Sequence, residues 1–191
     1  QLVALLLAQS LIIMTGMIDD IFELKPRQKV LGITLAALVV YFIANIKMTT
    51  LTVPFLGVVS LGWFSLPITL IWILGITNAV NLIDGLDGLA TGVAIIALST
   101  SALTGYFFLN VTSTFISIMM ATLVAALLGF LPYNFHPAKI YLGDTGSLFI
   151  GFMISVFSLY GLKNATFITL IIPVIILGVP ITDTLYAILR R

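Results

Sequence analysis

Long apolar runs alternate with short polar stretches along almost the whole chain. The runs can be marked at about residues 1–18, 29–46, 66–82, 89–108, 114–131, 146–161 and 164–183. A transmembrane helix needs about 20 predominantly apolar residues, and most of these runs approach that length. The pattern therefore predicts an all-α polytopic membrane protein with about seven transmembrane helices in this chain.

The stretch between the second and third runs has a different pattern. Residues 49–53 and 58–61 are rich in β-branched side chains, and Pro54 and Gly57 lie between them. This composition favours two short strands joined by a turn. We therefore expect a short β-hairpin on the outer side of the membrane. Because neither a repeat nor a low-complexity linker interrupts the chain, residues 1–191 are interpreted as a single membrane domain.

The overall composition agrees with a membrane protein. The chain is 61% hydrophobic and 8% charged, and its mean hydropathy is +1.25. It contains no cysteine, which excludes disulfides and thiolate metal sites. A net charge of +1 gives no reason to expect a nucleic-acid partner. The high hydropathy makes the lipid bilayer the expected surrounding.

Basic residues are distributed unevenly between the two sides that alternating spans would create. One side holds residues 19–28, 83–88, 132–145 and 184–191, and it carries Lys25, Arg27, Lys139, Arg190 and Arg191. The other side has only Lys47 and Lys163. Cytoplasmic loops of membrane proteins are enriched in Lys and Arg. The first side is therefore predicted to face the cytoplasm, which makes the protein a multi-pass protein of the cell membrane.

The acidic residues gather on or beside the same predicted side. They are Asp19, Asp20, Glu23, Asp84, Asp87, Asp144 and Asp183. A charged side chain at the bilayer centre costs about 2.5–3.5 kcal/mol even on insertion scales. Acidic residues were not used to orient the spans, so their gathering supports the seven-span interpretation. It also predicts a site for a metal or a polar substrate at the cytoplasmic face.

Adjacent carboxylates end the first run, at Asp19 and Asp20. Neighbouring side chains on a helix point about 100° apart, so one can face a ligand while the other braces the structure. Like charges this close can raise one pKa, which suits a general base. The alternative is a charged helix end that only marks the membrane interface.

A second polar motif runs from Asn78 to Gly88. Its oxygen-bearing side chains recur every third residue, at Asn78, Asn81, Asp84 and Asp87. Such oxygens suit Mg²⁺ and can also accept hydrogen bonds from a nucleobase or ribose. The alternative interpretation is a polar turn built on Asp-Gly pairs.

Two further motifs precede the sixth run and end the seventh. Asp144 lies just before the sixth run, where a helix N-terminus attracts phosphate, and it can hold Mg²⁺ against that phosphate. Tyr141 can stack on a base or serve as a membrane anchor. His136 is interpreted as a hydrogen-bonding residue. Asp183, after Pro180, either reaches the site or pairs structurally.

The four motifs, in this order, resemble those of the polyprenyl-phosphate N-acetylhexosamine-1-phosphate transferase family. The resemblance covers nearly the whole chain and is closest to the bacterial undecaprenyl-phosphate N-acetylglucosamine-1-phosphate branch, which residues 132–139 favour over the muramoyl-pentapeptide branch. It implies transfer of N-acetylglucosamine-1-phosphate from UDP-N-acetylglucosamine to undecaprenyl phosphate, with release of UMP. This reaction initiates teichoic acid or cell-wall polysaccharide synthesis. A direct in-line attack and a route through an aspartyl intermediate both stay open.

The resemblance also implies roles for individual residues. Asp144 is expected to bind Mg²⁺, with Mn²⁺ as a substitute, and Asn81 to lie beside the metal or the diphosphate. One member of the Asp19–Asp20 pair is expected to deprotonate the lipid phosphate, so the catalytic set is Asp19, Asp20 and Asp144. The expected substrate-binding residues are Asn78, Asn81, Asp84, Asp87, Tyr141 and Lys25. Tyr141 would stack on uracil, and cations such as Lys25 would offset the repulsion between two anionic substrates.

The family has further N-terminal helices and a histidine-containing cytoplasmic loop, so the chain is expected to be a fragment of a longer enzyme that can form a homodimer. Three other classes compete with this prediction. An ion-coupled transporter would place carboxylates near the bilayer midplane. An intramembrane aspartyl protease is suggested by Gly143-Asp144, although position 141 is Tyr rather than Gly. A CDP-alcohol phosphotransferase would have Arg where Thr91 stands.

Overall fold

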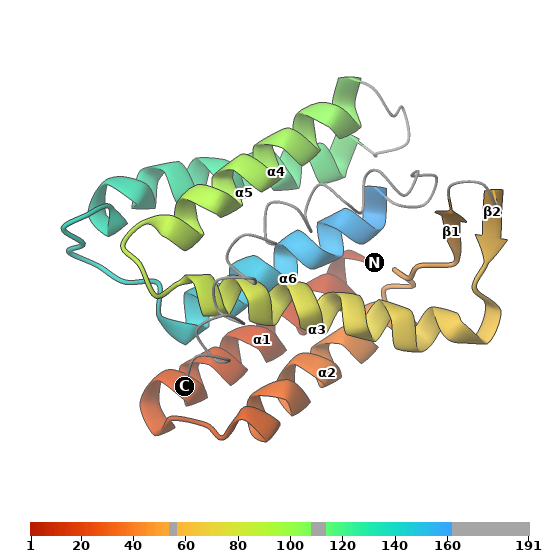
Figure 1. Ribbon diagram of the computed structural model, residues 1–191, viewed down its shortest axis with the longest axis horizontal. Helices are drawn as coiled ribbons and strands as arrows, with labels where there is room; N and C mark the ends of the chain where they lie inside the picture. The colour runs from red at the N-terminus through yellow and green to blue at the C-terminus, as the bar shows by residue number, and fades with distance from the viewer. Residues whose placement is uncertain (54–56, 108–113, 162–191) are drawn as a thin grey trace.

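The computed structural model describes residues 1–53, 57–107 and 114–161, and this part of the chain is mostly helical (Figure 1). Its α-helices are α1 (Leu2–Phe22), α2 (Pro26–Phe42), α3 (Ser65–Ile83), α4 (Leu89–Phe107), α5 (Thr114–Asn134) and α6 (Gly143–Gly161). They coincide, within a few residues at each end, with the first six predicted apolar runs. The seventh predicted run, 164–183, and the motif at 180–183 lie outside the described residues.

The predicted hairpin is confirmed. Strand β1 (Thr50–Val53) pairs antiparallel with β2 (Gly57–Ser60), with Thr50 opposite Ser60. A short 3₁₀ helix, η1 (Gly62–Phe64), leads from β2 into α3. Successive helices run in opposite directions, so the hairpin lies at one end of the helical bundle and the α1–α2 turn at the other (Figure 1).

Three helical stretches of the described chain are long and apolar enough to cross a membrane, Leu2–Phe22, Gly62–Ile83 and Phe115–Asn134. Leu89–Thr104 and Gly143–Leu159 are shorter apolar helices. Many large apolar side chains on these helices are exposed, among them Ile71, which is 69% exposed. Such an outward apolar surface suits lipid and marks a membrane protein. The total of about seven spans stays a prediction.

Small residues let the helices approach closely. In α6, a Cβ added at Gly151 would lie 2.9 Å from Cα of Thr77 in α3, and one added at Gly16 of α1 would overlap the backbone of Thr145 in α6. Small interface residues are the usual means by which membrane helices pack, because lipid provides no hydrophobic drive between helices. Helix α6 therefore packs tightly against both α1 and α3, whereas α4 packs mainly on α5.

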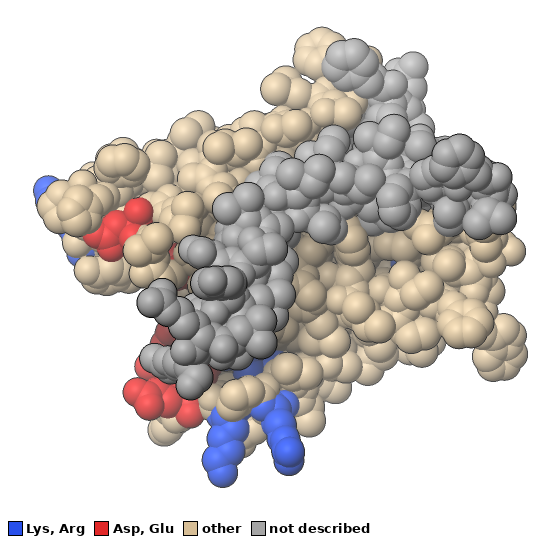
Figure 2. All heavy atoms as spheres, in the orientation of Figure 1, with Lys and Arg blue, Asp and Glu red and all other residues tan. Residues whose placement is uncertain are grey.

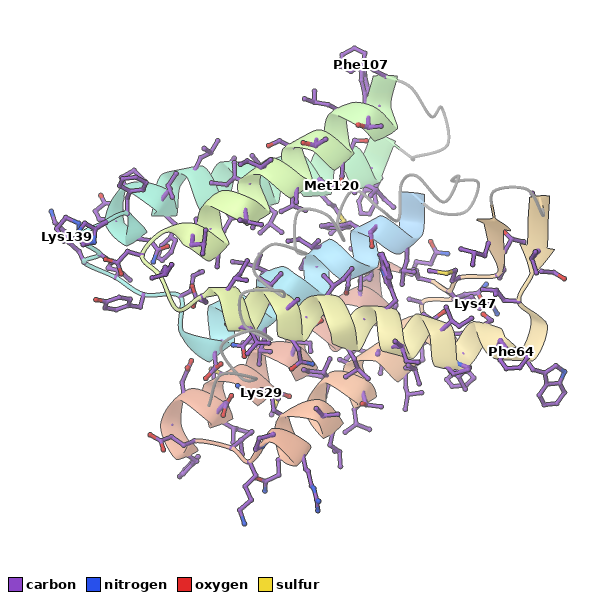
Figure 3. All side chains as sticks on the ribbon, in the orientation of Figure 1. Lys29, Lys47, Phe64, Phe107, Met120 and Lys139 are labelled. Atoms are coloured by element: carbon purple, nitrogen blue, oxygen red, sulfur yellow. The ribbon has the colours of Figure 1, made fainter. Side chains whose placement is uncertain are left out.

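Charged side chains gather at the end of the bundle where α1 ends and α2 begins (Figure 2). Lys29 and Lys139 lie toward this end, whereas Lys47 lies at the opposite end near Phe64 and the hairpin (Figure 3). The described acidic residues all belong to helix termini or loops of the Lys29 end. The packing of α1 and α3 on α6 thus brings polar motifs that are distant in sequence to one place.

Candidate active site

A lysine joins four helices at the charged end of the bundle. The Lys29 ammonium, from the start of α2, forms an ion pair with Asp19 of α1 and lies 2.9 Å from Oδ1 of Asp144 in α6. It also donates to Oδ1 of Asn81 in α3, at 3.4 Å. These residues, Asp19, Lys29, Asn81 and Asp144, are called the Lys29 cluster below. One cation therefore holds two carboxylates and an amide oxygen together.

Asp19 is the buried member of the cluster. Its side chain is 4% exposed, and its Oδ1 accepts a hydrogen bond from the Leu24 amide at 2.8 Å. The chain can return to Asp19 because Glu23 adopts a left-handed conformation, with φ of 48°, directly after α1. A buried carboxylate without a countercharge is costly, and Lys29 provides that countercharge to Asp19.

Asp20 points to a different target, the N-terminus of α6. Its Oδ1 accepts from the Asp144 amide at 2.7 Å, and its Oδ2 accepts from the Thr145 amide at 3.0 Å and from the Thr145 hydroxyl. The first N–H groups of a helix have no partner within the helix, and a carboxylate there also complements the helix dipole. Asp20 thus caps α6 from a neighbouring helix.

The cap requires glycine at position 143. Gly143 has φ of 64°, and a Cβ there would lie 3.0 Å from both carboxylate oxygens of Asp20. The two neighbouring carboxylates contact different partners, as helix geometry allows. Asp19 faces the Lys29 cluster. Asp20 holds the first turn of α6 and thereby fixes the position of Asp144. The catalytic roles expected of Asp19, Asp20 and Asp144 stay predictions.

Asn81 orients Asp144. Its Nδ2 donates to Oδ1 of Asp144 and, at 2.8 Å, to the Ser147 hydroxyl. Ser147 donates in turn to the Gly143 carbonyl at 2.8 Å, so it belongs to the first turn of α6. Lys29 and Asn81 both donate to Oδ1 of Asp144. The metal-binding roles expected of Asn81 and Asp144 stay predictions.

Asp84 lies just beyond the C-terminus of α3. Burial and then the negative charge of Asp144 together raise its pKa to about 6. A carboxyl group whose pKa is raised by burial and by a like charge gains most from a nearby cation. Asn78, by contrast, donates at 2.8 Å to the Leu74 carbonyl of its own helix. The substrate-binding roles of both residues stay predictions.

Asp87 ties two loops together. Its Oδ2 accepts from the Ala138 amide at 3.1 Å and contacts Nδ1 of His136 at 3.0 Å. The Ala138 amide and then the His136 side chain hold the pKa of Asp87 below its usual range. Asn134 strengthens the same connection, since it accepts from the Thr91 hydroxyl at 2.7 Å and donates to the Ile140 carbonyl at 3.1 Å. The loop after α3 is thereby fastened to the loop before α6.

The remaining expected residues lie beside the Lys29 cluster rather than in it. Lys25 is exposed, and its backbone amide donates to the side chain of Gln28 at 3.0 Å at the start of α2. Tyr141 is 70% exposed in the loop before α6. Both side chains are free to meet a ligand from solvent. Asp183 lies outside the described residues.

The central cation of the site is Lys29 and not Lys25, the lysine that the sequence predicts as a substrate-binding residue. The sequence does contain a signal for Lys29, because it is the only basic residue in the predicted apolar run 29–46. An ionisable residue inside a membrane helix needs a partner and marks a functional site. Thr145 and Ser147 also hold site residues, since Thr145 donates to Asp20 and Ser147 accepts from Asn81.

The Lys29 cluster has a donor set that fits Mg²⁺. In the part of the chain that the structure describes, there is no group of three or more His, Cys, Asp and Glu side chains able to hold a metal by themselves. Mg²⁺, however, commonly binds through one or two carboxylates and completes its shell with water and substrate phosphates. Asp19, Asp144 and Asn81 already direct oxygens at one cation, the Lys29 ammonium.

Comparison with known proteins identifies the family. Residues 2–162 match the sequence model of glycosyl transferase family 4. The chain belongs to this family, in agreement with the resemblance of its motifs.

Named relatives agree with this membership. Over all of its length the chain is 47% identical to the Bacillus subtilis (strain 168) protein named probable undecaprenyl-phosphate N-acetylglucosaminyl 1-phosphate transferase, and it covers 53% of that protein. Over 92% of its length it is 35% identical to phospho-N-acetylmuramoyl-pentapeptide-transferase of Halalkalibacterium halodurans, of which it covers 54%. The chain thus spans about half the length of the curated relatives it matches.

Proposed function

We propose that the protein carrying this chain transfers N-acetylglucosamine-1-phosphate from UDP-N-acetylglucosamine to undecaprenyl phosphate and releases UMP. The acceptor and the transferred group follow the name of the Bacillus subtilis relative, which is more similar to this chain than the Halalkalibacterium halodurans relative is, at 47% against 35% identity. The UDP-linked donor follows the resemblance of the motifs. The product would initiate teichoic acid or cell-wall polysaccharide synthesis.

The observation that carries the proposal is the Lys29 cluster. Two carboxylates and an amide oxygen converge on one cation at the charged end of an otherwise apolar bundle. A lipid phosphate reaches a membrane enzyme only at the interface, which is where such an end lies. Phosphoryl transfer depends mainly on positioning and on charge stabilisation, and a cation held among carboxylates provides both.

Each group of the site has a place in this reaction. An oxygen of the lipid phosphate attacks the phosphorus attached to the sugar, and the bond from that phosphorus to the oxygen of UMP breaks. Asp19 is the member of the carboxylate pair within the cluster, so it is assigned the proton of the lipid phosphate. Asp20 acts through α6, whose first turn it fixes. A bound Mg²⁺, held by Asp144 and Asn81, would neutralise phosphate charge.

The groups around the cluster are assigned to the nucleotide. Asp84 and Asp87 belong to the loop after α3, and Tyr141 is exposed in the loop that Asp87 fastens to it. Tyr141 is proposed to stack on uracil. The exposed Lys25 is proposed to attract the anionic substrates. Asn78, in α3, is proposed to contribute to substrate binding.

Orientation and assembly form part of the same proposal. Residues 1–191 belong to a single membrane domain that crosses the cell membrane about seven times and has the Lys29 end in the cytoplasm. This sidedness follows the excess of Lys and Arg in the predicted loops of that end. A homodimer in the bilayer is compatible with the apolar outer surface of the helices.

The competing classes fit the geometry less well. A proton relay of a transporter would extend along the bilayer midplane, whereas the described acidic residues belong to helix ends and loops. An aspartyl protease needs two carboxylates that share a proton, but the ammonium of Lys29 lies between Asp19 and Asp144 and pairs with both. Membership in glycosyl transferase family 4 also argues against a CDP-alcohol phosphotransferase.

The proposal is tested by measuring UMP release from the complete protein that carries residues 1–191. The mixture contains undecaprenyl phosphate, Mg²⁺ and UDP-N-acetylglucosamine, and parallel mixtures lack the lipid or the metal. We expect UMP only in the complete mixture. A folded protein that releases no UMP from a panel of UDP-sugars would contradict the proposal.

A further inference from the structure

The Lys29 ammonium and a divalent metal ion would need the same oxygens. Lys29 contacts Asp19, Asp144 and Asn81, and these three side chains come from three different helices. The residues that fit Mg²⁺ are therefore already paired with a positive charge that belongs to the protein itself. Two cations among the same oxygens repel each other at contact distance, so the ammonium and a metal ion each weaken the binding of the other.

We propose that Lys29 holds the metal position in the absence of substrate, and that a divalent metal ion displaces its ammonium onto a phosphate oxygen of the substrate. The inference rests on the proposed function only for the identity of the phosphate-bearing ligand. The competition between Lys29 and metal follows from the contacts of the Lys29 cluster itself.

The side chain is suited to such a movement. A lysine ammonium is a compact charge on a flexible stem, so it can exchange one set of acceptors for another without backbone movement. Lys29 lies in the first turns of α2 and is 18% exposed. Asp19, at 4% exposed, is more deeply buried than the ammonium that it binds, so the route for the ammonium leads outward.

The displacement couples metal binding to phosphate binding. Without a phosphate, metal binding leaves the ammonium without its carboxylates, which lowers the metal affinity. With a phosphate present, the released ammonium gains a new anionic partner, which restores that affinity. Two ligands linked in this way must each strengthen the binding of the other by the same factor. Lys29 thereby favours metal binding when substrate is present.

The test measures Mn²⁺ binding to the complete protein in detergent by electron paramagnetic resonance, without any turnover. A short-chain polyprenyl phosphate is the phosphate probe. In the unaltered protein we expect the polyprenyl phosphate to tighten Mn²⁺ binding by about tenfold. In Lys29→Met we expect tighter Mn²⁺ binding without the probe, again by about tenfold, and loss of the coupling.

Lys47→Met is the matched control, because Lys47 lies at the opposite end of the bundle, near the hairpin (Figure 3). It should bind Mn²⁺ like the unaltered protein. Weaker or unchanged Mn²⁺ binding in a folded Lys29→Met protein would overturn the inference.

A second measurement needs no variant, which matters because Lys29→Met leaves Asp19 and Asp144 without a countercharge. Amine acylation of the unaltered protein, read by mass spectrometry, reports how accessible each lysine is. We expect Mn²⁺ to raise labelling of Lys29 about threefold or more, with Lys47 unchanged as internal reference. Labelling of Lys29 that does not respond to Mn²⁺ would contradict displacement.

The two proposals fail in different ways. If Mn²⁺ competes with Lys29 but no UDP-sugar yields UMP, the displacement stands and the proposed reaction falls. If UMP forms while Lys29→Met binds Mn²⁺ no more tightly than the unaltered protein, the reaction stands and the displacement falls.

Discussion

The capping of α6 by Asp20 leads to a quantitative prediction for Asp20→Ala. The substitution removes the acceptor of the Asp144 amide, the Thr145 amide and the Thr145 hydroxyl. Loss of an N-cap costs about 1 kcal/mol, and loss of a carboxylate at a helix N-terminus costs about 0.3–1 kcal/mol. Because these hydrogen bonds are exposed, water replaces part of them, and we expect a loss of about 1–2 kcal/mol in the free energy of unfolding.

Reversible unfolding in mixed micelles, followed by circular dichroism, measures this loss. Glu23→Gln is the control, since Glu23 lies in the same loop and its side chain is exposed. Asp20→Ala should also lower UMP release by about 100-fold, because Asp144 begins the helix that is no longer fixed. An Asp20→Ala protein that unfolds within about 0.5 kcal/mol of Glu23→Gln would refute the capping argument.

Four further predictions follow from the same site. Gly143→Ala should destabilise the protein by about 1–2 kcal/mol, since φ is 64° there and Asp20 is in contact; denaturant unfolding measures it. Asp144→Asn should lower UMP release by about 100-fold or more with the fold intact. Asp84 holds its proton more tightly in the folded chain, with a pKa of about 6, than in the unfolded chain. The stability that the protonated Asp84 contributes is therefore present below the pKa of Asp84 in the unfolded chain and is lost as the pH rises through about 6. In a pH series of unfolding curves, Asp84→Asn should abolish that loss. Asp87→Ala should increase hydrogen exchange in the loop before α6, since it removes the acceptor of the Ala138 amide; unchanged exchange there would contradict the loop connection.

Much of the fold could be predicted because local sequence patterns determine it. A helix in lipid must be apolar over most of its length, so the helices coincide with the apolar runs. The hairpin could be predicted from β-branched segments around Pro54 and Gly57 for a similar reason. These patterns arise from neighbouring residues, and no information on tertiary contacts was needed.

The division of labour between Asp19 and Asp20 could be predicted only in part. Helix geometry requires the two side chains to diverge. Which of them faces the Lys29 cluster depends on the close approach of α1 to α6, where Gly16 meets Thr145. That approach is a tertiary fact, and no spacing within the first motif reveals it.

The central role of Lys29 was hidden for the same reason. Its partner Asp144 is 115 positions away along the chain, and Asn81 is 52 positions away. From the sequence alone, basic residues near the membrane indicate topology or a site that attracts anions. These two signals do not distinguish Lys25 from Lys29. Only the packing of four helices makes Lys29 the counterion of two carboxylates.

The most direct test of the account follows the phosphorus atom that the reaction is proposed to transfer. UDP-N-acetylglucosamine labelled at the β-phosphate is incubated with the complete protein, Mg²⁺ and undecaprenyl phosphate, and the organic-extractable label is counted. The account predicts one labelled phosphate in the lipid for each UMP released, and neither product with Asp144→Asn. UMP release without label in the lipid, or labelled lipid that the Asp144→Asn protein makes equally well, would contradict it.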